Sequence, residues 1–390
     1  MTIVNNNRVV SIDLLKGLVM VIMALDHVRD YFHYSANFFD PTDPTQTTFP
    51  IYFTRWITHF CAPTFCFLAG ISAFLVGKRK TPKELSVFLA TRGLWLVLIE
   101  LTVVNFGWFF DPEFRTFGLL VIWSLGICMI ALSVLIYLPP KVLLLFCGVL
   151  IFGHNLLDSV DLDNNVLWNI LHQPTLINVT PHTQLFIGYP VIPWIAVMAL
   201  GYYFGQYYDQ SFDSSKREKL FNAIGFVSII LFLILRGTNF YGNPTPWLDY
   251  EGFTKDLYSF FNPNKYPPSL LYLLMTLGVA FLFLANSENL KGRVVNFFCT
   301  FGRVPFFYYI LHLYAIHITA MIFAEISGLG WEHFILPTWI GFIPEIKGYG
   351  YNLITVYLVW LGIVAILYPI CKKFDAYKQN HKPKTWLSYL

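Results

Sequence analysis

The chain has 390 residues, of which 56% are hydrophobic and 13% are charged, and the charged share is about half that of soluble globular domains. This composition excludes a soluble protein and predicts an all-α, polytopic transmembrane helix bundle in a lipid bilayer. The net charge of +3 is small and no basic run contains interleaved aromatic residues, so nucleic-acid binding is excluded as well.

Apolar segments long enough to span a membrane recur about ten times along the chain. No internal repeat and no flexible linker separates them, so we expect one transmembrane, acyltransferase-like domain over residues 1–390. The segments lie near residues 11–33, 51–76, 87–109, 117–138, 141–158, 184–207, 220–236, 268–286, 294–323 and 352–371.

Lysine and arginine gather in every second connection between these segments, as in residues 78–83, 216–219 and 372–384. By the positive-inside rule, we expect a multi-pass protein of the cell (inner) membrane with both termini in the cytoplasm. The longer connections that are poor in basic residues then face outward. These are residues 34–50, 159–183, 237–267 and 324–351.

The first segment, residues 11–34, combines an apolar helix with several ionisable side chains, a costly arrangement inside a bilayer. On a helix, Lys16 and His27 share one face and lie about 16 Å apart along the axis. The sequence therefore predicts a stripe that lines a hydrated cavity, although Lys16 could instead snorkel to the headgroups and Asp30 could lie in the interface. The stripe consists of Asp13, Lys16, Met20, Met23, His27, Asp30, Tyr31 and Tyr34.

Further histidines lie within apolar segments, namely His59, His154, His312 and His317. A single intramembrane histidine often serves only packing, but His59 reaches a depth similar to that of His27, and several such residues favour a functional cluster. Only His27 and Asp30 have the helical spacing typical of metal ligands, so we expect no metal site.

Basic side chains also lie near the predicted cytoplasmic ends of the segments, namely Lys16, Arg92, Arg293 and Arg303. Positive-inside anchoring explains Arg293 and also suits Arg92. Lys16 and Arg303 are each followed directly by apolar helix with few polar partners. They are therefore the first candidates for contacts with phosphate groups.

Several segments together resemble a known family. They are SIDLLKG and MVIMALDHVRD, then RWITHFCAPTFCFLAGISAF, YPVIPWIAVMALGYYFG, KYPPSLLYLLMTLG and GRVPFFYYILHLYAIH. The chain resembles bacterial membrane proteins grouped with the catalytic domain of heparan-alpha-glucosaminide N-acetyltransferase, in the transmembrane acyltransferase superfamily. In addition, Lys16, ten intervening residues and His27 match the R/K-x10-H signature of membrane acyltransferases that acetylate polysaccharides.

The resemblance implies that acetyl-CoA is the acyl donor substrate and that a sugar or glycan amine or hydroxyl across the membrane is the acceptor. The match of residues is partial. The family's lysosomal enzyme carries an amide side chain at the position of Asp26, and its proposed catalytic histidine lies in an outer loop before the segment of His59. Apart from His33, no histidine of this chain occupies such a loop position.

Roles for single residues follow from the chemistry that the resemblance implies, since acyl transfer from a thioester needs a base, oxyanion donors and cations for the phosphates. His27 is the candidate base, oriented by Asp30 one helical turn away, and His59 or His312 is the candidate oxyanion donor. The predicted catalytic residues are His27, Asp30 and His59, the substrate-binding residues are Asp26, Arg55 and His312, and the acetyl-CoA-binding residues are Lys16, Arg92 and Arg303.

Two other function classes use the same residues. A proton-coupled transporter of a small polar or sugar-like solute would use them as a proton relay, and a membrane scaffold or sensor would bury them in fixed pairs. The sequence leaves open which acceptor is used, whether acetylation occurs on nitrogen or oxygen, and whether the chain forms homo-oligomers.

Overall fold

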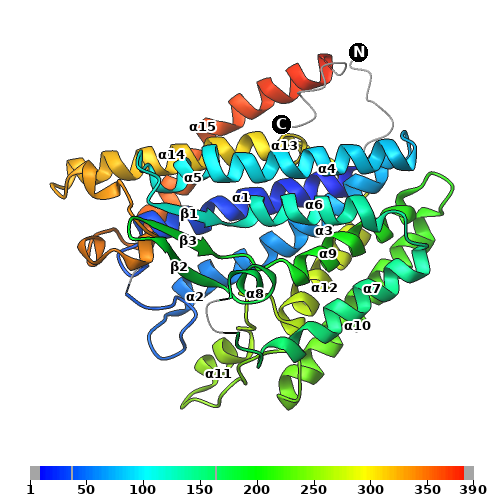
Figure 1. Cartoon of the computed structure of the whole chain (residues 1–390), viewed down its shortest axis with the longest axis horizontal. Helices are drawn as coiled ribbons and strands as arrows, with labels where there is room; N and C mark the ends of the chain where they lie inside the picture. Colours follow the sequence, from blue (N-terminus) through cyan, green and yellow to red (C-terminus); the bar gives the residue numbers. More distant parts are fainter. Residues whose placement is uncertain (1–8, 37, 163–164, 382–390) are drawn as a thin grey trace.

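The computed structural model describes residues 9–36, 38–162 and 165–381. Its long helices pack side by side, and α1 runs through the middle of the bundle (Figure 1). The helices are α1 (Val10–Phe32), α2 (Phe49–Trp56), α3 (Cys61–Gly77), α4 (Pro82–Ile99), α5 (Asn105–Phe109), α6 (Val121–Leu135), α7 (Pro140–Gly153), α8 (Val166–Leu171), α9 (Ile192–Phe204), α10 (Ser214–Thr238), α11 (Phe253–Phe260), α12 (Leu270–Asn286), α13 (Arg293–Arg303), α14 (Pro305–Ile326) and α15 (Leu353–Asn380).

A small mixed sheet lies at one end of the bundle, which we call the sheet end (Figure 1). It consists of β1 (Thr116–Leu119), β2 (Thr175–Thr180) and β3 (Thr183–Ile187); β3 pairs in parallel with β1 and antiparallel with β2. The all-α prediction is corrected on this point. The predicted segments 117–138 and 184–207 begin as strands, because a short apolar run suits a buried strand as well as a helix.

The structure supports a membrane protein, but it does not confirm ten spans. Among the described residues, six helical stretches are long and apolar enough to cross a membrane: Phe49–Gly77, Pro82–Phe109, Pro140–Leu157, Ser214–Thr238, Pro305–Ile326 and Leu353–Asn380. The apolar helices α6 and α12 are shorter, and α1 carries several charged side chains. Lys382 and Lys384, which contributed to the predicted orientation, lie outside the described residues.

The predicted segment 294–323 is divided into two helices, α13 and α14. The break falls at Val304, whose backbone leaves the helical region at φ −131° and ψ 49°. Pro305 follows directly, and a proline disfavours helical geometry in the residue before it. The helix therefore restarts with Pro305 in its first turn, where the missing N–H is tolerated.

The connection between α10 and α12 is fixed at the sheet end by one buried arginine. Arg236, in the last turn of α10, donates hydrogen bonds to the carbonyl oxygens of Phe260 at 3.0 Å, Thr245 at 2.9 Å and Ser259 at 2.8 Å. These bonds join the end of α10 to three backbone carbonyls of the connection. They also hold the chain that leads to Lys265.

Helices α1 and α13 approach each other closely because two glycines face across their contact. A Cβ atom built on Gly17 would lie 1.8 Å from the Phe298 carbonyl oxygen, and one built on Gly302 would lie 1.8 Å from the Asp13 carbonyl oxygen. Small residues allow this kind of close backbone packing between helices in membranes. The contact fixes α1, which carries the predicted site residues, against α13.

We expect Gly17→Ala to lower the free energy of unfolding by about 1 to 3 kcal/mol, because the new methyl group must push the α13 backbone away. Thermal unfolding of the purified protein in detergent measures this effect. Gly148→Ala is the matched control, since Gly148 lies within α7 and has no neighbour within 4 Å of its built Cβ. Equal midpoints for the two variants would contradict the close packing.

Candidate functional site

A cavity of about 300 Å³ lies beside the second half of α1, and we call it the large cavity. The α1 side chains from Met20 to Asp30 form one part of its wall. Most of the rest comes from α2, α3, α5, α6, α14 and β3, from the residues just after β3, from the loop around Lys265 and from Trp339. The cavity therefore brings together segments that are far apart in the sequence.

A second cavity of about 160 Å³, which we call the small cavity, lies beside the first half of α1. Its basic side chains are Lys16, which donates a hydrogen bond to Ser72 Oγ at 3.1 Å, and Arg92 of α4. Phe65 and Ile122 line both cavities. The two cavities therefore adjoin at these apolar side chains.

Five of the eight residues of the predicted α1 stripe line the two cavities, and Asp13, Tyr31 and Tyr34 do not. Lys16 lines the small cavity, and Met20, Met23, His27 and Asp30 line the large one. The stripe thus follows the two cavities along the helix. Of these five side chains, Met20 and Met23 occupy the middle and carry no charge.

His27 forms a hydrogen-bonded pair with His312 of α14, and this pair defines which of its ring nitrogens carries a proton. His27 Nδ1 and His312 Nε2 are 2.8 Å apart, while His312 Nδ1 is 3.0 Å from the Tyr308 carbonyl oxygen. A carbonyl only accepts, so the neutral His312 ring carries its proton on Nδ1 and accepts at Nε2. His27 then donates from Nδ1. Its Nε2 is left with a lone pair and no hydrogen-bond partner among the described residues, in a side chain that lines the large cavity.

The prediction that Asp30 orients His27 is wrong. Asp30 accepts a hydrogen bond from Arg29 at 2.5 Å, so its carboxylate is engaged within α1. The helical spacing allowed a contact between Asp30 and His27, but the stronger attraction of an adjacent guanidinium prevails. A neutral histidine, His312, takes the place of the carboxylate beside His27.

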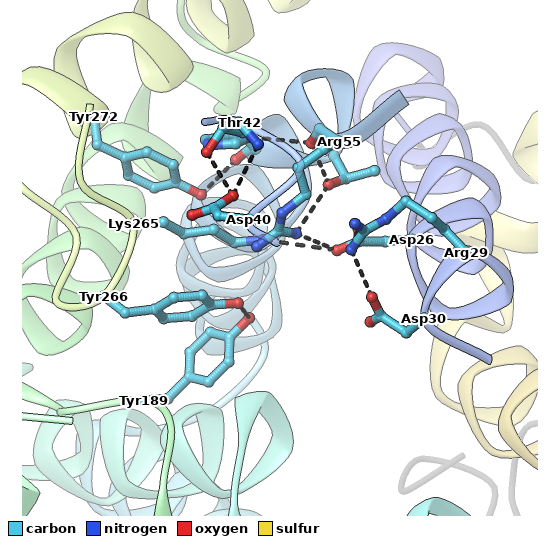
Figure 2. Close-up of polar contacts among 12 residues, drawn as sticks. Asp26, Arg29, Asp30, Asp40, Thr42, Arg55, Tyr189, Lys265, Tyr266 and Tyr272 are labelled. Carbon is cyan, nitrogen blue, oxygen red and sulfur yellow. Dashed lines mark hydrogen bonds and ion pairs between the residues drawn. The ribbon is translucent and has the colours of Figure 1, made fainter. Parts of the chain in front are cut away.

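Asp26 is the centre of a buried charge cluster, in which basic side chains approach it from three elements (Figure 2). Arg29 donates to Oδ1 at 3.1 Å, Arg55 of α2 donates to Oδ2 at 2.6 Å, and Lys265 Nζ lies 3.8 Å from Oδ2. The Asp26 side chain is only 12% exposed. Together with Asp30, the cluster contains three cations and two carboxylates on the wall of the large cavity.

Lys265 and Tyr266 are parts of this wall that the sequence interpretation missed. Both belong to the loop before α12, and Tyr266 shares a hydrogen bond with the hydroxyl of Tyr189 at 3.4 Å (Figure 2). Burial raises the pKa of Tyr266, but the Lys265 and Arg55 cations outweigh burial and leave this pKa below its usual value. The available signal was a lysine in a connection predicted to face outward, where lysine is disfavoured.

Trp108 and Tyr309 are two further wall residues that the sequence did not single out. Their rings lie 4.7 Å and 6.4 Å from the His27 ring, both edge-on. Trp108 ends the α4–α5 stretch, where an aromatic residue is typical of the membrane interface. The sequence alone could not show whether Trp108 lies at the membrane interface or in the wall of a cavity.

Other predicted site residues lie away from the two cavity walls. His59 is buried behind Arg55, with Nδ1 3.2 Å from the Arg55 carbonyl oxygen, and its own carbonyl accepts a hydrogen bond from Tyr272 at 2.6 Å. Arg303 donates to Asp375 of α15 at 2.7 Å and is absent from the small-cavity wall. His312 contacts His27 from behind and does not line the large cavity.

A comparison with known families shows which family the chain belongs to. The profile of the family described as "Heparan-alpha-glucosaminide N-acetyltransferase, catalytic" matches residues 8–242, more than half of the chain. The chain belongs to this family. Family membership, together with the apolar helices, supports a membrane acetyltransferase. A search of curated proteins gives no significant match.

The family match covers only part of the site. Asp26, His27, Arg55 and Trp108 lie within the matched residues, and Lys265, Tyr266, Tyr309 and Trp339 of the large-cavity wall lie beyond them. The unmatched third of the fold therefore completes the same cavity, and it also supplies His312, the partner of His27.

Proposed function

We propose that the chain transfers an acetyl group from cytosolic acetyl-CoA to an amine or hydroxyl group of a sugar or glycan on the other side of the bilayer. The observation that carries this proposal is His27, which lines the large cavity in the tautomer that accepts a proton at Nε2. Acetyl transfer is the chemistry of the family to which the chain belongs. Among the residues of the wall, His27 has a neutral imidazole nitrogen that can take a proton and later return it.

His27 acts as the general base in this reaction. Its Nε2 takes the proton from the acceptor as the acceptor nitrogen or oxygen attacks the carbonyl carbon of the thioester. The carbon–sulfur bond then breaks, and the CoA thiolate takes the proton back from the His27 imidazolium, which gives free CoA. His312 keeps Nδ1 of His27 hydrogen-bonded throughout, so the ring holds its orientation and its tautomer.

Lys16 and Arg92 supply positive charge for the CoA phosphates. Both line the small cavity, at the end of α1 that the basic connections assign to the cytoplasm. The rise along α1 from Lys16 to His27 is about 16 Å, a distance that suits an extended pantetheine arm. Of the three predicted cations, Arg303 pairs with Asp375 and does not line the small cavity, so we retain Lys16 and Arg92.

The acceptor binds in the large cavity, next to the charge cluster around Asp26. Carboxylate oxygens accept hydrogen bonds from sugar hydroxyls and amines, and the Arg55 and Lys265 side chains donate them. Asp26 and Arg55 therefore remain the proposed acceptor-binding residues. The polar cluster and His27 line the same cavity, so an acceptor held there can present its nucleophile to the base.

A proton-coupled transporter is less well supported. Such a protein needs a series of ionisable groups through the membrane. Between Lys16 and Asp26, α1 presents Met20 and Met23 to the cavities, and methionine has no exchangeable proton. The uncharged middle of the stripe and the family match both favour the enzyme.

Acetyl-CoA binding by the purified protein is the decisive measurement. We expect saturable binding, and we expect Lys16→Ala and Arg92→Ala to weaken it by about 1 to 3 kcal/mol each, a roughly 5- to 150-fold rise in Kd, because each removes a charge-assisted contact with phosphate. Isothermal titration calorimetry in detergent gives these constants.

Arg293→Ala is the matched control for these variants. Arg293 lies at the start of α13 on the same side of the bundle, and it does not line the small cavity. Its replacement should change Kd by less than about twofold. An equal loss for all three variants would indicate a diffuse surface field without a defined site, and an absence of binding would contradict the proposed function.

A further inference from the structure

Two buried hydrogen-bond donors beside His27, the indole N–H of Trp108 and the hydroxyl of Tyr309, have no acceptor among the described residues. Trp108 Nε1 and Tyr309 Oη lie close to each other without a well-formed hydrogen bond between them, and neither has a partner elsewhere among the described residues. Trp108 is 5% exposed and Tyr309 is 2% exposed. Most buried polar atoms in folded proteins have partners, and these two unpaired donors differ from the others in this structure in that both belong to residues that contact the His27 ring.

The surroundings hold both rings in place at the large-cavity wall. The Trp108 carbonyl oxygen accepts a hydrogen bond from Tyr31 at 2.5 Å, and the Trp108 ring packs on Trp339 at 5.3 Å. Tyr309 packs edge-on against His312 at 5.4 Å, one helical turn before it on α14. Both donors are thus fixed relative to the His27–His312 pair.

The donors that the sequence predicted near His27 are already engaged or lie off the cavity wall. His312 donates from Nδ1 to Tyr308 and accepts at Nε2 from His27, so it has no proton left to offer. His59 lies off the cavity wall, and Arg55 is paired with Asp26. The Trp108 N–H and the Tyr309 O–H therefore remain as donors next to the base.

We infer that Trp108 and Tyr309 form the oxyanion-stabilising site of this enzyme and donate hydrogen bonds to the acetyl oxygen of the thioester. This inference rests on the proposed acetyl transfer. It replaces His59 and His312 as oxyanion donors and assigns a catalytic role to two residues on α5 and α14.

The two donors act at one step of the reaction. When the acceptor attacks the carbonyl carbon, the electron pair of the C=O double bond moves to oxygen, while His27 holds the acceptor proton. The Tyr309 O–H and the Trp108 N–H stabilise the resulting negative charge, because donors that are already fixed in place need no reorganisation at the moment of reaction. The C=O bond then re-forms, the carbon–sulfur bond breaks, and the leaving thiolate takes the proton from His27.

Tyr309→Phe is the sharpest test, because it removes one oxygen atom and keeps the ring. We expect kcat to fall about 100-fold with little change in Kd for acetyl-CoA, since one oxyanion donor is lost only from the transition state. Trp108→Phe should lower kcat by a similar factor. Acetyl transfer to glucosamine, followed by release of free CoA, gives kcat.

Tyr308→Phe is the matched control. Tyr308 precedes Tyr309 on α14, and its hydroxyl is likewise buried without a hydrogen-bond partner, but it does not line the large cavity. Its kcat should stay within about twofold of wild type. Equal kcat values for Tyr308→Phe and Tyr309→Phe would overturn the inference.

Infrared spectroscopy with acetyl-CoA labelled with ¹³C at the carbonyl group gives a readout that does not depend on turnover. The bound carbonyl band should lie at lower frequency than in solution, and Tyr309→Phe should remove much of this shift while Tyr308→Phe keeps it. If wild type binds and turns over acetyl-CoA but Tyr309→Phe changes neither kcat nor the band, only the oxyanion assignment fails. If wild type does not bind acetyl-CoA, the proposed function itself fails.

Discussion

Replacing His27 with glutamine is expected to lower turnover about 100- to 10,000-fold while acetyl-CoA binding stays near that of wild type. Glutamine can still hydrogen-bond within the wall, but it cannot take a proton from the acceptor. His27 faces the large cavity, away from the Lys16 end that is proposed to hold the phosphates, so kcat should fall without a comparable rise in Kd. Acetyl transfer to glucosamine and calorimetric binding of acetyl-CoA measure the two quantities separately.

His59→Gln is the control that decides between the two predicted histidines. His59 is buried behind Arg55 and does not line the large cavity, so its variant should keep most of the turnover if the protein folds. Thermal unfolding of each variant establishes whether the variant is folded. If His27→Gln were active and His59→Gln were folded but inactive, His59 and not His27 would be the base.

Replacing Asp26 with asparagine should lower the free energy of unfolding by about 3 kcal/mol, because it leaves three buried cations with too little opposing charge. Arg29 and Arg55 both donate to this carboxylate, and Lys265 lies 3.8 Å from it. The loss should appear as a lower midpoint in denaturant or thermal unfolding of the protein in detergent.

Asp30→Asn is the matched control for Asp26→Asn. Asp30 contacts Arg29 alone among the three cations, and Arg29 keeps its bond to Asp26 when Asp30 is replaced. We expect a loss of about 1 kcal/mol or less. If both variants lost the same free energy of unfolding, Asp26 would contribute no more to the stability of the cluster than Asp30 does.

Much of the fold could be predicted because hydrophobicity and helical periodicity are local properties. Each predicted apolar segment contains helix in the structure, and the α1 stripe from Lys16 to Asp30 lines the cavities. The sheet was missed because β1 and β3 are short apolar runs directly before α6 and α9, and periodicity cannot separate such strands from a helix end.

The site was only partly predictable because its decisive contacts join distant parts of the chain. His27 and His312 are 285 positions apart, and only the packing of α1 against α14 brings their rings together. The local alternative, Asp30 one turn from His27, was visible in the sequence but gave the wrong partner. Lys265 reaches Asp26 because Arg236 fixes the preceding connection, which no local pattern encodes.

Phe65 and Ile122, where the two cavities adjoin, have a consequence for the cell that contains this protein. An enzyme with the function proposed here joins a cytosolic donor to an acceptor outside. It must do so without letting protons leak through it and dissipate the gradient across the membrane. Apolar side chains at this point offer an ion no replacement for its water shell. The free-energy cost of moving an ion from one cavity to the other is therefore high. In the reaction that we propose, the thioester arm is neutral and meets no such barrier, so acetyl transfer does not require any ion to cross between the two cavities.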